Sequence, residues 1–437
     1  MREVRGWAES FVALASATFS LWRRLGPRIL PIFAVTLVAQ RAFQLLSIWA
    51  CTWVPVAEYD DQLNRTETNH WNQWVAVGLL ALSFLALLLG LVVILRIIGA
   101  ELDGQRAAPV GERASFSRTL SITLLSFLGI YSVFDYISDT TSALVLDSAV
   151  LTGDMSFDFN YAALSPEDWN ETLTVIAIIV GAFILRRILD LIGRKLARGW
   201  LGVAATALEA FYLLVFFVAG YKVVNQIAIW IDQREGVYSF RRWFVEVTYP
   251  LRWFGLNLPE ALQAAWDWFW ETGWPIGVRS FLLPMLWFAL ASLVLGSAIR
   301  SFGEILEGGS RLTIASARRR EALVQLQDAV FGDLDEKYLP AWQAIKLTWK
   351  AGAGMLGSLV ISFNLIELGA EWLAYAVAWL IGPTTLEIML LYSYISQFFI
   401  QLLEWPLMLC MMGACYALSF NGGHFAMRAP ARAVAGP

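Results

Sequence analysis

Charged residues are scarce in this chain. Only 16% of its 437 residues are Asp, Glu, Lys or Arg, whereas 58% are hydrophobic and 14% are aromatic. A soluble domain usually has about a quarter charged residues and a little under half apolar ones, so this composition excludes an ordinary soluble domain. The formal net charge of -4 and the lack of a domain-sized basic patch also exclude a nucleic-acid-binding protein.

Cysteine and histidine are rarer still. The chain has 3 Cys (Cys51, Cys410 and Cys415) and 2 His (His70 and His424). Three cysteines do not make a disulfide framework, and the sequence has no Cys-x-x-Cys pair, no Gly-rich phosphate loop and no Gly-x-Ser-x-Gly motif. We therefore expect no cofactor and no metal ion, and the lack of a His, Ser or Cys constellation argues against an enzyme.

The hydrophobic residues are gathered in long runs. Each run can cross the ~30 Å apolar core of a bilayer, because a helix rises about 1.5 Å per residue. The eight runs cover residues 29–55, 74–97, 119–137, 172–193, 200–229, 280–300, 351–371 and 385–419. The pattern predicts an all-α polytopic transmembrane helix bundle that forms one transmembrane domain over residues 29–437.

Basic residues are concentrated in alternate connections between these runs. Arg23, Arg24 and Arg28 precede the first run, whereas residues 138–170 and 372–384 contain no Lys or Arg. Because Lys and Arg accumulate on the cytoplasmic side of membrane proteins, we expect both termini in the cytoplasm. The preference for Arg over Lys indicates a bacterial source, so we expect a multi-pass protein of the cell inner membrane, or plasma membrane.

Three segments outside the runs have a pattern of their own. Residues 1–28 read as an amphipathic helix lying on the cytoplasmic membrane surface, and residues 301–350 as a helical cytoplasmic connection. Residues 230–279 are rich in Trp and read as an interfacial segment on the outer face, because Trp favours the headgroup zone. Within this last segment, Gly273 and Pro275 predict the end of a helix.

Polar side chains inside the runs are the strongest candidates for function, because a charge near the bilayer centre is costly and normally faces protein or water. The candidates are Gln40, Arg41 and Gln44 in the first run, Glu209 in the fifth, and Gln397, Gln401 and Glu404 in the eighth. In the seventh run, Glu367 and Glu371 are expected near the outer end, where water is close.

Three interpretations of these candidates remain open. Arg41 could pair with Glu209 or Glu404 and hold three helices in register. Alternatively, the side chains could line a hydrated path, or form a site for a lipid or a partner peptide. The first function hypothesis is a transport protein or channel component for an ion or small solute. The second is a non-catalytic accessory or structural subunit of a membrane or envelope complex, with membrane lipids, other envelope proteins or a second copy of the chain as partners.

Overall fold

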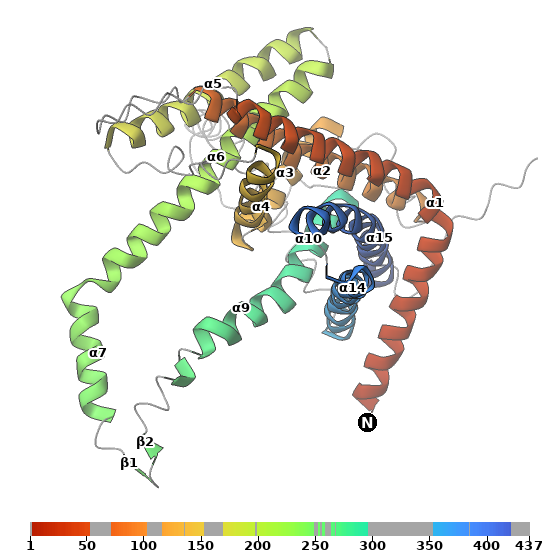
Figure 1. The fold of residues 1–437 in the computed structure, drawn as a ribbon. Coiled ribbons are helices and arrows are strands. Elements are labelled where there is room, and N and C mark those ends of the chain that lie inside the picture. Colours follow the sequence, from red (N-terminus) through yellow and green to blue (C-terminus); the bar gives the residue numbers. More distant parts are fainter. Residues whose placement is uncertain are drawn as a thin grey trace, which may run out of the picture.

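The computed structural model of the protein is built almost entirely of helices (Figure 1). It describes residues 2–52, 71–102, 116–134, 136–152, 169–196, 199–248, 252–253, 256–257, 264–266, 268–295, 353–383 and 385–420. The segment expected to form a cytoplasmic connection, residues 301–350, lies outside these described residues. The only strands within them, β1 (Arg252–Trp253) and β2 (Leu256–Asn257), pair antiparallel.

Each of the eight runs expected from the sequence contains a helix. They are α1 (Arg2–Thr52), α2 (Trp71–Glu101), α3 (Phe116–Val133), α4 (Tyr136–Thr152), α5 (Trp169–Leu196), α6 (Gly199–Asp232), α7 (Glu235–Thr248), η3 (Phe269–Gly273), α9 (Trp274–Gly277), η4 (Val278–Leu282), α10 (Leu283–Leu295), α14 (Ala353–Ile381) and α15 (Leu386–Phe420). Among the described residues, 6 helices are long and apolar enough to cross a membrane: α1, α2, α6, the run that includes η4 and α10, α14 and α15. The other two expected runs fall on α3, which is a shorter apolar helix, and on α5.

The first helix continues through the boundary that the sequence suggested at residue 28. α1 is a single helix with Pro27 and Pro31 inside it, and it bends once along its length (Figure 1). Proline removes a backbone donor and crowds the preceding turn, so we attribute the bend to these residues. The N-terminal half has the expected apolar side, but Leu14 and Leu21 on that side are 0% exposed. They pack against other helices, and a position at the membrane surface stays a prediction.

The second half of α1 runs antiparallel to α2, and three contacts fix the register. Arg24 pairs with Glu101 at one end, and Ser47 Oγ donates to the Ala76 carbonyl oxygen at 2.9 Å at the other. Between them the helices touch closely, because a Cβ placed on Gly90 would lie 2.2 Å from the Thr36 hydroxyl oxygen. Small residues allow this kind of close approach between apolar helices.

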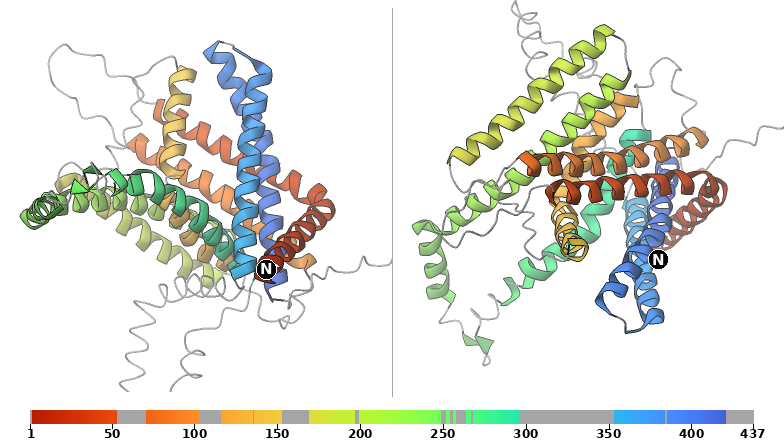
Figure 2. Two further views of the ribbon diagram at one scale, coloured as in Figure 1. Left: turned by 90° about the horizontal axis from the view of Figure 1, so that it is seen from below. Right: turned by 45° about the horizontal axis from the view of Figure 1, so that its top comes forward.

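Aromatic side chains tie the remaining helices to this pair. Tyr131 of α3 packs against Phe84 of α2 with ring centroids 5.4 Å apart and against Phe127 at 4.4 Å. Trp287 of α10 reaches Phe127 on one side and Trp405 of α15 on the other, at 6.1 and 5.0 Å. The core therefore forms around α1 and α2, where α3, α6, α10 and α15 pack against them. The paired helices α14 and α15 extend away from it (Figure 2).

Most hydroxyl groups in the apolar helices are satisfied locally. Thr18, Thr36, Thr123 and Thr206 each donate to the carbonyl oxygen of the residue four positions earlier in their own helix, at 2.8 to 2.9 Å. In an apolar surrounding this bond removes the cost of an unpaired donor. These hydroxyls therefore need no functional explanation, which leaves the amides and charges as candidates.

The structure corrects one helix end predicted from the sequence. The chain stays helical from residue 268 to residue 295, through Gly273 and Pro275. Two wide turns make this possible: Trp274 N–H bonds to the Phe269 carbonyl oxygen, and Leu283 N–H bonds to that of Val278. Such i→i+5 turns re-space the backbone bonds around a proline, so Pro275 does not stop the helix.

Candidate functional site

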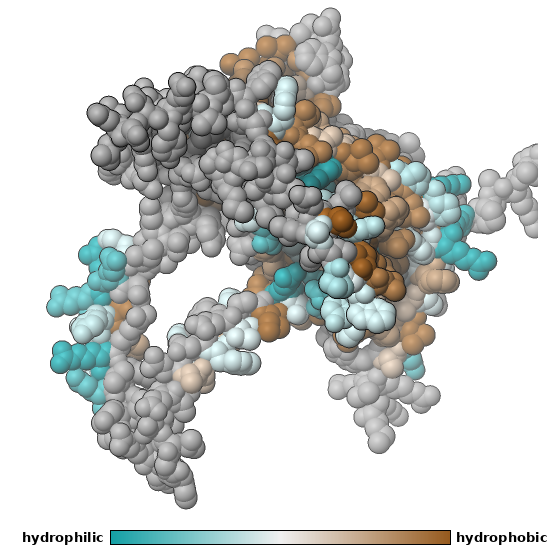
Figure 3. All heavy atoms as spheres, in the orientation of Figure 1, coloured by the Kyte–Doolittle hydropathy of each residue, from teal (hydrophilic) through white to brown (hydrophobic). Residues whose placement is uncertain are grey.

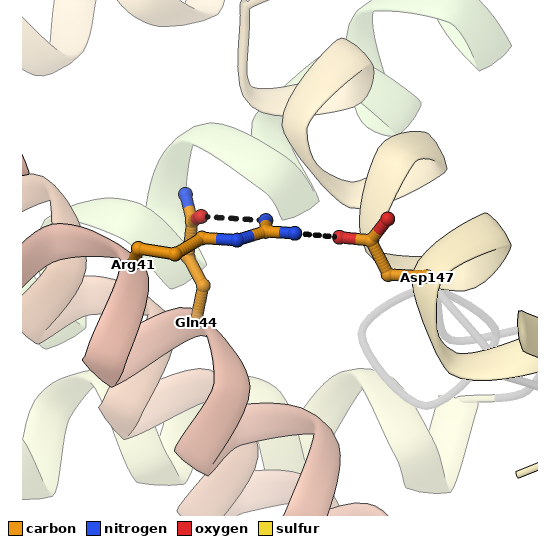
Figure 4. Close-up of polar contacts among 3 residues, drawn as sticks. All are labelled: Arg41, Gln44 and Asp147. Atoms are coloured by element: carbon orange, nitrogen blue, oxygen red, sulfur yellow. Dashed lines mark hydrogen bonds and ion pairs between the residues drawn. The ribbon is translucent and has the colours of Figure 1, made fainter. Parts of the chain in front are cut away.

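Arg41 joins three helices, but not through either of the carboxylates expected from the sequence. Its guanidinium donates to Asp147 Oδ2 of α4 at 2.6 Å and to Gln44 Oε1 at 3.2 Å (Figure 4). The ring of Tyr394 in α15 lies 4.7 Å below it, within cation–π range. The expected pairing of Arg41 with Glu209 or Glu404 was wrong, because Asp147 occupies that role.

Asp147 was missed because residues 138–170 read as an acidic connection. In the structure it lies on α4, and its side chain is 3% exposed. The signal was present in the sequence: Ile137, Thr141, Leu144 and Asp147 recur at helical spacing, and all four are buried. A carboxylate at the end of an otherwise buried helical stripe indicates a buried partner, and Arg41 is that partner.

Glu209 forms a second ion pair that is closed to solvent. Its Oε2 atom lies 3.2 Å from Arg186 Nε and accepts a hydrogen bond from Ser121 Oγ at 2.7 Å. The side chains of Arg186 and Glu209 are 8% and 1% exposed. We call these two residues the sealed pair. It links α5 to α6, and Ser121 adds α3.

The position of Arg186 follows from the helical hairpin. α5 and α6 are joined at residues 197–198, and Arg186 and Glu209 lie at equal sequence distance from that connection, about 15 Å along each helix. Antiparallel helices bring such positions side by side. Arg186 is not among the candidates named from the sequence, because it lies near the end of the apolar run 172–193.

A third polar group lies between η4, α14 and α15. Arg279 donates to Glu367 Oε1 at 3.1 Å, and the two side chains are 60% and 21% exposed. One turn earlier, the Asn364 amide donates to the Ser280 carbonyl oxygen at 2.8 Å. Glu404 of α15 lies within electrostatic range of Glu367 and Glu371. We call Arg279, Glu367, Glu371 and Glu404 the open cluster.

Two members of the open cluster lie at mid-length of their helices, and a position of Glu367 near the outer membrane face stays a prediction. α14 continues to Ile381, so Glu367 is its middle residue, and Glu404 is one residue from the middle of α15. Arg279 was missed because the sequence predicted a helix end just before it. The π-helical turns carry the helix across that point and bring the arginine to α14.

The remaining candidates are the glutamines Gln40, Gln397 and Gln401. Gln397 and Gln401 are exposed on α15, in the two turns before the half-buried Glu404, and Gln40 is half-buried on α1. The candidates expected to converge therefore fall into three groups: Arg41 with Gln40 and Gln44 on α1, Glu209 on α6, and Glu404 with the two glutamines of α15. Within the described parts of the chain, no three His, Cys, Asp or Glu side chains are grouped as metal ligands would be.

Comparison with known proteins gives no further guide. Neither a protein-family model, nor a curated protein, nor a solved structure matches this chain. The class that the fold defines is an all-helical protein whose apolar helices are compatible with an integral membrane protein. The features of the described residues that bear on function are therefore the Arg41–Asp147 pair, the sealed pair and the open cluster.

Proposed function

We propose that this protein is a transport protein or channel component that moves an ion or small solute across a membrane, with the open cluster on its path. The proposal depends on one observation: the open cluster combines several charged side chains with incomplete burial. Glu367 and Glu404 lie near mid-length of α14 and α15, which can cross a bilayer, and Glu367 pairs with Arg279 at one end of the candidate span Val278–Leu295. Glu371 and Glu404 add negative charge nearby, and Arg279 remains 60% exposed.

A charged side chain within a membrane has a large free-energy cost unless it is solvated or paired. A charge facing acyl chains near the bilayer centre is strongly unfavourable, so such groups face water or other protein. The sealed pair and the Arg41–Asp147 pair meet this requirement with their own partners. The open cluster has more carboxylates than guanidinium groups, and several of its side chains are exposed. Water and cations in a hydrated path along α14 and α15 would solvate these side chains and offset their negative charge.

The glutamines of α15 extend this path. Gln397 and Gln401 are exposed on the turns that precede Glu404, which gives a polar line along one apolar helix. An amide offers both donors and acceptors and suits a partly dehydrated solute. The excess of carboxylates favours a cation or a proton over an anion.

Flux measurements on the purified protein in liposomes test this function. Proton, sodium and potassium flux are measured with ion-sensitive dyes for the unaltered chain, for Glu367→Gln and for Glu404→Gln. We expect at least one of the ions to cross, and both substitutions to abolish its flux. The control is Glu246→Gln on α7, which removes the same charge from an exposed site and should leave flux unchanged. Unchanged flux in both cluster variants would refute the proposal.

We also propose the finer topology: eight spans, both termini cytoplasmic, in the inner membrane. The alternation of Arg-rich and Arg-free connections supports it. Single cysteines placed at residues 160 and 383, labelled from one side of right-side-out vesicles, would both react if these connections are external. Protection of either cysteine there would contradict this topology.

A second function, an accessory subunit of a membrane complex, is favoured by a different observation. Trp372, Tyr375 and Trp379 on α14 are 65%, 68% and 74% exposed, and large aromatic side chains are typical of interface anchors. Gentle detergent extraction followed by mass spectrometry separates the two functions. A fixed stoichiometry with a different protein would support a subunit, and a homogeneous assembly of this chain alone would count against it.

A further inference from the structure

The helix α7 separates polar and apolar side chains onto different sides. Val237, Phe240 and Trp243 follow one another at i, i+3 and i+6, whereas Arg242 and Glu246 lie on the other side. Arg242 Nε and Glu246 Oε1 are 3.2 Å apart, and both side chains are largely exposed. Phe240 and Trp243 pack ring to ring at 5.7 Å, yet they stay 60% and 56% exposed.

The chain places α7 beside the point where α6 leaves the membrane. α6 contains a candidate span and has 34 residues, which is about 51 Å of helix. The apolar core and both headgroup layers together are about 40–45 Å thick. The far end of α6 therefore reaches the headgroup layer, and α7 begins only three residues after α6 ends.

The junction between the two helices is itself well ordered. Arg234 N–H donates to the Ile231 carbonyl oxygen at 3.0 Å, and Tyr238 N–H donates to that of Arg234 at 3.0 Å. The Arg234 guanidinium lies 3.4 Å above the Trp230 ring. These contacts hold α7 at an angle to α6, and the helix points along the outside of the molecule (Figure 1).

We infer that α7 is a lipid-binding helix that lies along the surface of a phospholipid bilayer. Phe240 and Trp243 enter the boundary between headgroups and acyl chains, and the Arg242–Glu246 pair faces water. Figure 3 shows hydrophilic side chains along the outer edge of α7, which is the edge left to water in this arrangement. The inference depends on the membrane insertion of α6 and not on the transport proposal.

A lipid surface fits this helix better than a second protein does. Trp and Arg are the residues that favour the headgroup zone, because an aromatic ring or an alkyl stem can be buried while a polar tip remains in contact with water. An amphipathic helix with this division of side chains binds in the plane of the interface. Residues 234–248 carry three Arg and two Glu, which is compatible with zwitterionic as well as anionic headgroups.

Spin labels on the full-length protein in phosphatidylcholine vesicles test the inference. Single cysteines replace Val237 or Phe240 on the apolar side, and Ser239 or Glu246 on the polar side. The background carries Cys51→Ser, because Cys410 and Cys415 are buried and the environment of Cys51 is not described. The measurement is the ratio of collisions with oxygen, which concentrates in lipid, to collisions with a water-soluble nickel chelate.

We expect this ratio to be several-fold higher at residues 237 and 240 than at residues 239 and 246. Equal ratios on both sides would overturn the inference, since they would place α7 in water. Protection of residues 237 and 240 from both reagents would also overturn it, because a second protein would then cover the helix. With Phe240→Asp and Trp243→Asp, the label at residue 237 should become accessible to nickel while the thermal unfolding midpoint stays unchanged.

Discussion

Glu209 and Glu367 each pair with an arginine, but the two ion pairs have opposite surroundings. The sealed pair Arg186–Glu209 is 8% and 1% exposed and has Ser121 as an additional donor, whereas Arg279 and Glu367 are 60% and 21% exposed. In the first case one buried guanidinium lies 3.2 Å from one buried carboxylate. In the second, Glu371 and Glu404 add negative charge that Arg279 does not neutralise.

This difference distinguishes two roles of charged residues in an apolar helix bundle: stabilising the fold and taking part in transport. A buried pair with matched charges and supporting hydrogen bonds holds helices in place, and it becomes costly as soon as one partner is lost. An exposed pair contributes little to stability because water already solvates both groups. The free energy of unfolding should therefore follow burial, and transport should follow the unbalanced charge.

The largest effect is expected at the sealed pair. Glu209→Gln leaves the Arg186 guanidinium buried without its charged partner, and this should cost about 3–5 kcal/mol of unfolding free energy. Denaturant titration of the purified protein, followed by circular dichroism, measures the loss. Replacing both residues, with Arg186→Met and Glu209→Leu, should recover most of it, and a double variant no more stable than Glu209→Gln alone would show that the charges are needed for another reason.

An intermediate effect is expected at Arg41. Asp147 is buried while the Arg41 side chain is 36% exposed, so Asp147→Asn should cost about 1.5–3 kcal/mol, the range for a hydrogen bond to a charged group. The same titration measures it. A cost equal to that of Glu209→Gln would break the proposed dependence on burial.

The smallest effect on stability is expected at the open cluster. Arg279→Gln should cost no more than about 1 kcal/mol, and the loss should shrink further in high salt because the pair is screened. The exposed Arg242–Glu246 pair on α7 provides the baseline, since Arg242→Gln should change stability by less than about 0.5 kcal/mol. If Arg279→Gln destabilised the protein as strongly as Glu209→Gln, the cluster would be structural rather than part of a path.

The sequence was sufficient to predict the helical class, because runs of apolar residues have few other solutions in a membrane. It also identified Arg41, Glu209 and Glu404 as the charges that need partners. It did not predict the partners, since pairing depends on which helix faces which, and the pattern within one helix carries no such information. Asp147 came from a segment read as a connection and Arg279 from a segment read as a helix end.

The backbone geometry around Pro275 explains why the helix end predicted at this position was wrong. Pro275 has a strong preference to stop or kink a helix, and only the wide turns on either side of it allow the run to continue. The second of these turns, η4, packs against α14, where the Asn364 amide binds the Ser280 carbonyl oxygen. A long-range contact of this kind has no trace in the local sequence.

The packing of α1 has a consequence for how the protein is made. Its N-terminal half lies against α14, where a Cβ on Gly354 would approach the Ser10 hydroxyl to 3.7 Å. Because α14 lies far after α1 in the chain, this side of α1 can be covered by α14 only after a long stretch of the protein has been synthesised. The association of α1 with the α14–α15 pair is therefore a late step in the folding of this protein.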